Sequence, residues 1–157
     1  MLRLSKLADY GTQVMTYMAR DRIVHSASEV AAGLGIALPT VSKILKMLVR
    51  KNLVISVLGA KGGYRLTRHP REISIADIID AMDGPISITE CSSTSTCVRE
   101  SFCSTRSNWQ GINHIIQDAL EKVNLAEMIA PKPQQPKQVS KFQVVDISAI
   151  RSRGMTV

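Results

Sequence analysis

Apolar residues recur at helical spacing through the first fifty residues of the chain. From residue 5 to residue 20 they fall on one side of a predicted helix: Leu7, Tyr10, Val14, Tyr17 and Met18. The segment Ser26-Ala-Ser-Glu29 has the S-x-x-E pattern of a capping box, so it predicts that a second helix begins there. Gly33 and Gly35 are expected to end that helix, and Pro39 suits the first turn of a third.

The third predicted helix has an apolar face and a polar face. Val41, Ile44, Leu45 and Leu48 follow the i, i+3, i+4, i+7 spacing of a buried face. The polar face holds Thr40, Ser42, Lys43, Lys46 and Arg50. Two helices joined by a tight turn, the second with a basic face, are typical of a DNA-binding helix-turn-helix. On that geometry Thr40 and Lys43 would read base edges, while Lys46, Arg50 and Lys51 would contact phosphates. An ordinary amphipathic surface helix would show the same pattern.

A predicted β-hairpin follows this helix directly. Residues 53–58 are apolar and rich in β-branched side chains, Gly59-Ala-Lys-Gly-Gly63 is a turn, and Tyr64 begins a return strand. This order predicts a winged helix-turn-helix, with positive charge on the wing at Lys61, Arg65 and Arg68. The glycine-rich turn lacks the spacing of a phosphate-binding loop, so nucleotide binding is not expected.

The remaining sequence completes a mainly α fold with one small β-hairpin wing. Ser74 is expected to cap a further helix that Gly84-Pro85 ends. A long helix is predicted from about residue 104 to residue 127, with an apolar stripe of Trp109, Ile112, Ile116, Ala119 and Val123. Such a stripe needs a partner, so we expect a homodimer. The predicted parts are a winged helix-turn-helix (1–84), a cysteine-rich loop (85–103), a dimerisation helix (104–130) and a flexible tail (131–157).

The charge of the chain is unevenly distributed. Its 157 residues have a net charge of +7. Residues 1–70 carry 11 Lys and Arg against 3 Asp and Glu, whereas residues 71–130 carry 4 against 9. A basic first half beside an acidic centre indicates that double-stranded DNA would contact only the first half.

All three cysteines lie in one short polar segment, as Cys91, Cys97 and Cys103. An odd number does not suit a disulfide scaffold, and neither a secretory signal nor an apolar run of membrane-spanning length is evident, so we expect a cytoplasmic protein with reduced thiols. The C-x5-C-x5-C spacing differs from that of structural zinc sites. It favours an iron–sulfur cluster, [2Fe–2S] or [4Fe–4S], ahead of a thiol switch and of zinc.

Catalytic motifs are missing from the sequence. There is no nucleophile elbow, HExxH motif or paired-acid constellation, and His25, His69 and His114 have no motif around them. An enzyme with a small-molecule substrate is therefore not expected.

The order of these motifs resembles the Rrf-two family of winged-helix regulators, whose members include the IscR-type and NsrR-type iron–sulfur sensors. The phrases SKLADYG, LPTVSKILK, AKGGYRL, ITEC and NWQ-x-IN are most similar to regulators of SUF-type iron–sulfur cluster assembly. The resemblance covers residues 1–130. It implies a homodimeric bacterial transcription factor, with a cluster on Cys91, Cys97 and Cys103 that sets affinity for an operator and represses cluster-assembly genes. A thiol-switch regulator and a nitric-oxide-sensing repressor of the same fold are the alternatives.

The resemblance leaves the fourth cluster ligand open. The IscR type has a histidine three residues after the last cysteine, where this chain has Arg106, whose guanidinium is a poor ligand. The NsrR type uses an aspartate from the first helix of the other subunit, and Asp9 falls at that place. Asp9 could equally stabilise the start of its own helix. A small molecule or water, Glu90 and His114 follow as candidates.

Overall fold

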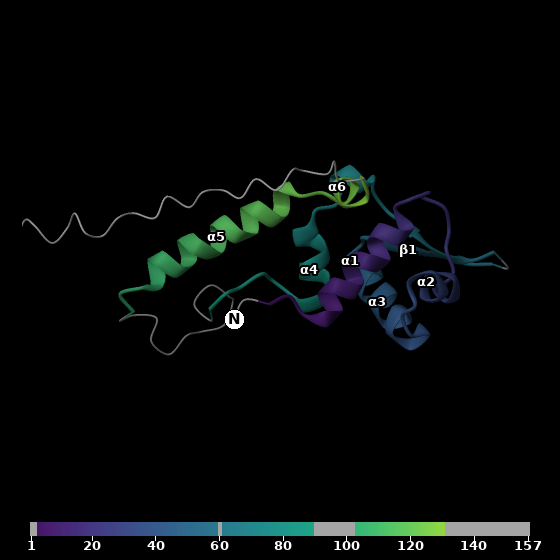
Figure 1. Cartoon of the computed structure of the whole chain (residues 1–157), viewed down its shortest axis with the longest axis horizontal. Helices are drawn as coiled ribbons and strands as arrows, with labels where there is room; N and C mark the ends of the chain where they lie inside the picture. Colours follow the sequence, from purple (N-terminus) through teal and green to yellow (C-terminus); the bar gives the residue numbers. More distant parts are fainter. Residues whose placement is uncertain (1–2, 60, 90–102, 131–157) are drawn as a thin grey trace, which may run out of the picture.

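The computed structural model describes residues 3–59, 61–89 and 103–130 (Figure 1). Its elements, in chain order, are the helices α1 (Lys6–Met18), α2 (Ala27–Leu34) and α3 (Leu38–Arg50), the strands β1 (Val54–Val57) and β2 (Gly63–Leu66), the short 3-10 helix η1 (Pro70–Glu72), and the helices α4 (Ile75–Asp83), α5 (Arg106–Lys122) and α6 (Leu125–Ile129). None of the helices in the described ranges is both long enough and apolar enough to cross a membrane.

The core lies between α1, α3 and α4. Ser5 caps α1 by accepting a hydrogen bond from the Ala8 N–H, and Val14, Met15 and Met18 turn inward and are fully buried. Helix α4 packs closely on α1, because Gly11 has no side chain at the contact. A Cβ at Gly11 would lie 2.8 Å from Met82 Cγ.

The predicted helix-turn-helix is confirmed, with one correction at the start of α2. Ser26 Oγ accepts a hydrogen bond from the Glu29 N–H at 3.1 Å, but the Glu29 carboxylate does not return to the backbone of Ser26. It lies 3.0 Å from His25 Nδ1 instead, so only half of the capping box forms. Gly35 ends α2 in the left-handed region at φ 65°, which favours glycine. Pro39 lies in the first turn of α3, as expected.

The wing is an antiparallel hairpin in which Val54 pairs with Leu66 and Val57 with Gly63. A third segment of the chain pairs with this hairpin, which the sequence did not predict. His25 and Tyr64 exchange two backbone hydrogen bonds, of 2.9 and 2.8 Å. A Cβ at Gly63 would collide with the carbonyl of His25, so this close pairing requires glycine there. The wing is therefore joined to the segment between α1 and α2.

The prediction of one continuous helix from residue 104 to residue 127 is wrong. Helix α5 ends at Lys122, and the chain then runs beside the start of α4, where the Ile75 N–H donates to the Val123 carbonyl and the Leu125 N–H to the Ile73 carbonyl, both at 2.9 Å. Asn124 caps the short helix α6, and Leu125 is fully buried. Burial of Leu125 in the core and the backbone bonds around it outweigh the local helical pattern. Val123 packs against this core rather than extending the apolar stripe.

Helix α5 extends away from the winged part of the molecule (Figure 1). It packs against α4, yet Trp109, Ile112 and Ile115 remain 40%, 42% and 68% exposed. Only Asn113 is buried among the residues of α5.

Candidate DNA-binding surface and cysteine segment

Helix α3 presents the expected basic face. Val41, Ile44, Leu45 and Leu48 are fully buried and hold the helix against the core. The polar side of the same helix follows from this packing: Lys43, Lys46 and Arg50 are exposed, and Thr40 and Ser42 are half-buried. The cationic face of a second helix in a helix-turn-helix is thus available to a phosphate-rich ligand.

The wing carries two further exposed cations. Lys61 lies in the turn and Arg65 in β2. Within the described parts of the chain, Lys43, Lys46, Arg50, Lys61 and Arg65 form no ion pair. Their charges are therefore not offset by neighbouring carboxylates. We call these five residues the basic surface.

Lys51 and Arg68 each have acidic partners within the chain. Lys51 Nζ lies 2.7 Å from Asp80 Oδ2, and Arg68 lies 3.6 Å from Asp77 while also donating to the carbonyl of Glu72. Both cations therefore hold α4 and η1 in place and are not part of the basic surface. The acidic residues of α4 that partner them come from the chain's acidic centre, so local charge along the sequence did not reveal these pairs.

Cys103 is the described member of the cysteine triplet, and it lies just before α5. Its Sγ is 3.4 Å from the hydroxyl of Thr105. That hydrogen bond, with backbone N–H groups of Thr105 and Arg106, lowers the pKa of the partly exposed Cys103 thiol. A thiol with a lowered pKa more readily gives the thiolate, which is the form that binds metal and reacts with oxidants.

The other candidate ligands are only partly described. Cys91, Cys97 and Glu90 lie outside the described residues. Asp9 is exposed in the first turn of α1, where its carboxylate accepts a hydrogen bond from Gln13 Nε2 at 3.2 Å. His114 is exposed on α5, 3.8 Å from Asp118. Within residues 3–59, 61–89 and 103–130, no three His, Cys, Asp or Glu side chains are grouped so as to hold a metal.

Asn113 fastens the segment that leads into the cysteine region. Its side-chain oxygen accepts from the Ile88 N–H, and its amide donates to the Ile86 carbonyl, both at 3.1 Å. The side chain is buried between α5 and this segment. Asn113 has no predicted role from the sequence, although it belongs to the NWQ-x-IN phrase. An isolated Asn on an otherwise apolar side of a helix was the available signal.

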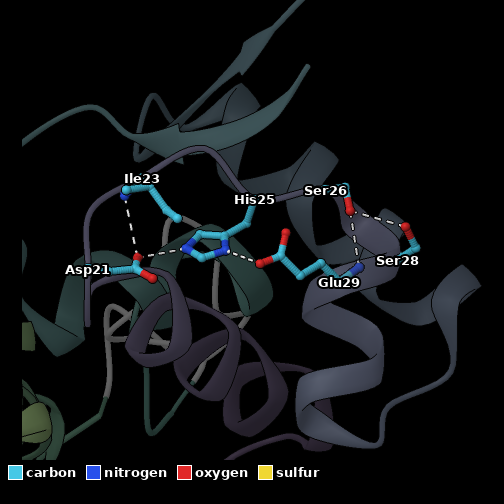
Figure 2. A network of polar contacts seen from close by, with 6 residues as sticks. All are labelled: Asp21, Ile23, His25, Ser26, Ser28 and Glu29. Atoms are coloured by element: carbon cyan, nitrogen blue, oxygen red, sulfur yellow. Dashed lines mark hydrogen bonds and ion pairs between the residues drawn. The ribbon is translucent and has the colours of Figure 1, made fainter. Parts of the chain in front are cut away.

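His25 is the second functional candidate that the sequence did not reveal. It is 2% exposed and lies between two carboxylates, Asp21 and Glu29 (Figure 2). Its position in a short polar connection gave no sign of burial. The i−4 and i+4 acids around it were the only signal.

Comparison with known proteins identifies the fold and its general role. The family described as "Rrf2: Iron-dependent Transcriptional regulator" matches residues 4–131. This chain belongs to the Rrf2 family. The HTH-type transcriptional regulator IscR of Vibrio campbellii is 28% identical to this Rrf2 protein over 149 residues, covering 91% of this chain and 87% of its own length. The HTH-type transcriptional regulator ORF2 of Azotobacter vinelandii is 31% identical over 105 residues, which cover 67% of this chain and 64% of that protein.

Solved structures agree with the winged-helix fold of the Rrf2 chain. CymR, the global cysteine regulator of B. subtilis, superposes with a TM-score of 0.68 at 25% identity, covering 82% of this chain and 97% of its own. IscR of T. potens superposes with a TM-score of 0.66 at 29% identity, covering 87% and 93%. The Rrf2 chain is thus a helix-turn-helix transcriptional regulator, and it is not an enzyme.

Proposed function

We propose that this regulator binds an operator in double-stranded DNA with an affinity set by an iron–sulfur cluster on Cys91, Cys97 and Cys103. The observation that carries this proposal is the thiol of Cys103, whose pKa is lowered directly before α5. Thiolates are the ligands that iron–sulfur clusters prefer. The family description, "Iron-dependent", supports the same reading. When bound, the cluster supplies a redox-active group that oxidants can degrade.

The contacts around the cysteine segment support a link from cluster to DNA. On one side of the segment, Asn113 fastens residues 86 and 88 to α5; on the other, Cys103 leads directly into α5. At the end of α4, Asp83 accepts a hydrogen bond from the Ser5 hydroxyl at 2.7 Å, which joins it to the cap of α1. Cluster binding to the cysteine segment would therefore act on α5, α4 and α1 together. The size of this coupling is limited by the difference in operator affinity between the cluster-bound and cluster-free states.

A three-way comparison tests the cluster. Wild type, Cys97→Ala and Asp9→Ala are purified anaerobically and measured for visible absorption, iron content and operator affinity. We expect Cys97→Ala to lose iron and absorption, whereas the control Ser95→Ala keeps them. Cys97→Ala with wild-type iron and affinity would refute the cluster. For Asp9 the matched control is Gln13→Ala, which removes the same hydrogen bond but keeps the carboxylate. Loss of the cluster in Asp9→Ala but not in Gln13→Ala would support Asp9 as a ligand from the partner subunit.

A thiol switch is the second candidate, because the lowered pKa of Cys103 also favours thiol oxidation. A colourless, iron-free protein whose operator affinity depends on reductant would favour this candidate. A nitric-oxide-sensing repressor would instead carry the cluster and lose it on exposure to nitric oxide. Repression of cluster-assembly genes is the expected outcome for the first candidate.

The proposed operator contacts are the basic surface together with Thr40 and Ser42, and Thr40 and Lys43 are the residues that would read base edges. Replacing Lys43 by Ala should weaken specific binding by about 1–3 kcal/mol if it contacts a base edge. Binding should also weaken steeply as salt is raised. Fluorescence anisotropy with a duplex selected from a random pool measures both effects. Lys122→Ala, which removes the same charge from α5, is the control. Unchanged affinity in a Lys43→Ala, Arg50→Ala double variant would remove this assignment.

The proposed homodimer uses the exposed apolar side of α5. Ile116, part of the predicted stripe, is half-buried and lines a hollow of its own chain beside Leu4 and Ile79. Ile115 is the better probe because it is largely exposed. Ile115→Asp would place an unpaired charge in the interface and should give monomers in sedimentation velocity. The control is Gln117→Asp on the other side of the helix. A wild-type dimer in Ile115→Asp would mean that another surface joins the subunits.

A further inference from the structure

His25 lies at a junction of three parts of the winged domain. Its side chain is buried between the end of α1 and the start of α2. Its backbone pairs with Tyr64 of β2, next to Arg65 of the basic surface. Glu29, which contacts the ring, lies in the first turn of α2. A change at this ring would therefore reach both the helix-turn-helix and the wing.

Both ring nitrogens of His25 face a carboxylate (Figure 2). Nε2 lies 2.8 Å from Asp21 Oδ1, and Nδ1 lies 3.0 Å from Glu29 Oε1. A neutral imidazole carries one N–H and one lone pair, so it could donate to only one of these acceptors and would face the other with its lone pair. The imidazolium donates to both. The geometry therefore selects the protonated ring.

The other groups around the ring are compatible with this charge. The ring of Tyr17, from α1, meets His25 edge-on at 5.4 Å between centroids, and Arg20 lies 6.0 Å from the same tyrosine ring. The wing contributes the backbone of Tyr64. Burial lowers the pKa of His25, but the hydrogen bonds to Glu29 and Asp21 raise it, and the net shift is upward.

We propose that His25 is a positioning residue for DNA binding, whose imidazolium fixes the wing against the helix-turn-helix, so that operator affinity falls as the ring loses its proton. This inference rests on the DNA-binding function proposed above. On deprotonation one ring nitrogen presents its lone pair to a carboxylate, and that contact opens. The pairing of His25 with Tyr64 then loosens, and Lys61 and Arg65 lose their fixed place relative to α3. DNA binding consequently weakens as pH rises.

The test measures affinity for the selected duplex between about pH 6 and about pH 9 at constant ionic strength. For the wild type we expect a fall of about tenfold, the size that the loss of one charge-assisted hydrogen bond would produce. His25→Gln should flatten that fall. A double variant, Asp21→Asn with Glu29→Gln, keeps the ring and should move the fall to lower pH. The titration of the ring, followed by NMR, should move in parallel with the affinity.

Two controls isolate His25 from the other titrating groups. His114→Gln removes an exposed histidine of α5 and should leave the profile unchanged. His69 caps η1 through Nδ1, which accepts a hydrogen bond from the Arg71 N–H. His69→Asn, whose side-chain oxygen can accept the same hydrogen bond, should leave the profile unchanged as well.

The outcomes separate the two proposals. If the wild type binds no duplex at any pH, both the DNA-binding function and the role of His25 are overturned. If the wild type binds but His25→Gln keeps the wild-type slope, only the role of His25 is overturned. Should His25→Gln fail to fold, the Asp21→Asn, Glu29→Gln double variant decides. If the ring titrates at lower pH but operator affinity still falls at the wild-type pH, the inference is overturned. If both move to lower pH together, the inference is supported.

Discussion

The winged part of the molecule buries its apolar residues, whereas helix α5 leaves several of its apolar residues exposed. In α3 four apolar residues are fully buried within the chain, whereas in α5 Trp109, Ile112 and Ile115 are left open. Helices α1 and α4 likewise have side-chain caps, from Ser5 and Ser74, but α5 has no side-chain cap bond. The winged part therefore contains most of what stabilises it. The stability of α5 depends more on contacts with a surface that covers its exposed apolar residues, which fits its proposed place in a subunit interface.

The two regions also differ in how a buried polar side chain is used. In the described parts of the chain, the buried polar residues are His25 and Asn113. His25 lies between two carboxylate partners and connects elements within the winged part. Asn113 is neutral, and it connects α5 to the segment that enters the cysteine region. Both act as tethers, because a buried polar group that loses its partners is costly.

The largest effect should come from a cavity in the winged core. Leu48 is fully buried in α3, so Leu48→Ala should lower the free energy of unfolding by about 2–5 kcal/mol. The matched change in the other region, Ile115→Ala, removes a side chain that is largely exposed in the chain and should cost less than about 0.5 kcal/mol in a monomeric background. Urea unfolding with Ile112→Asp, at the neighbouring exposed position of α5, as the monomeric parent and each change added to it, measures both. Equal losses would contradict the contrast between the two regions.

A smaller effect is expected at the tether of α5. Asn113→Ala leaves the Ile88 N–H and the Ile86 carbonyl without their partner and should cost about 1–3 kcal/mol. Amide hydrogen exchange should show faster exchange at Ile88 while the winged core stays protected. Gln117→Ala, on the same helix, is the control. Unchanged exchange at Ile88 would show that the segment is held by other contacts.

The tether in the winged part should make stability depend on pH. The pKa of His25 is raised, so its contribution is full below its ordinary value of about 6.5 and is lost as pH rises through the raised pKa. The pKa of Asp21 is lowered, chiefly by the hydrogen bond from His25, so its contribution is present above pH 3.8 and is lost as pH falls through the lowered pKa. The free energy of unfolding of the wild type should therefore exceed that of His25→Gln by the largest amount in mildly acidic solution. A stability difference that does not vary with pH would exclude a charged His25.

The smallest effect should come from the surface pair of Lys51 and Asp80. Both side chains are partly exposed, so Lys51→Ala should cost at most about 1 kcal/mol of stability. Because this charge is already partnered, the change should weaken operator binding less than Lys43→Ala does. Thermal unfolding and anisotropy on the same samples give both values. A loss of affinity as large as that of Lys43→Ala would show that Lys51 contacts the operator despite its pairing with Asp80.

The sequence by itself determined the elements whose cause is local. The spacing of Val41, Ile44, Leu45 and Leu48 determined which face of α3 is buried, and the cations on the other face followed from that spacing. Gly35, Pro39 and Ser74 marked helix ends because their backbone and capping preferences act within a few residues. The wing and its turn could also be predicted from the sequence, because their strand and turn preferences act within a few residues.

Only the tertiary structure decided the contacts between distant segments. Lys51 pairs with Asp80, which lies 29 positions away in the sequence. Leu125 is buried in the core, so it is not part of the predicted long helix. The burial of His25 depends on the packing of α1 and α2 and on the pairing with Tyr64. No periodicity signals such contacts, because they arise from the three-dimensional proximity of residues whose local preferences are satisfied in other ways.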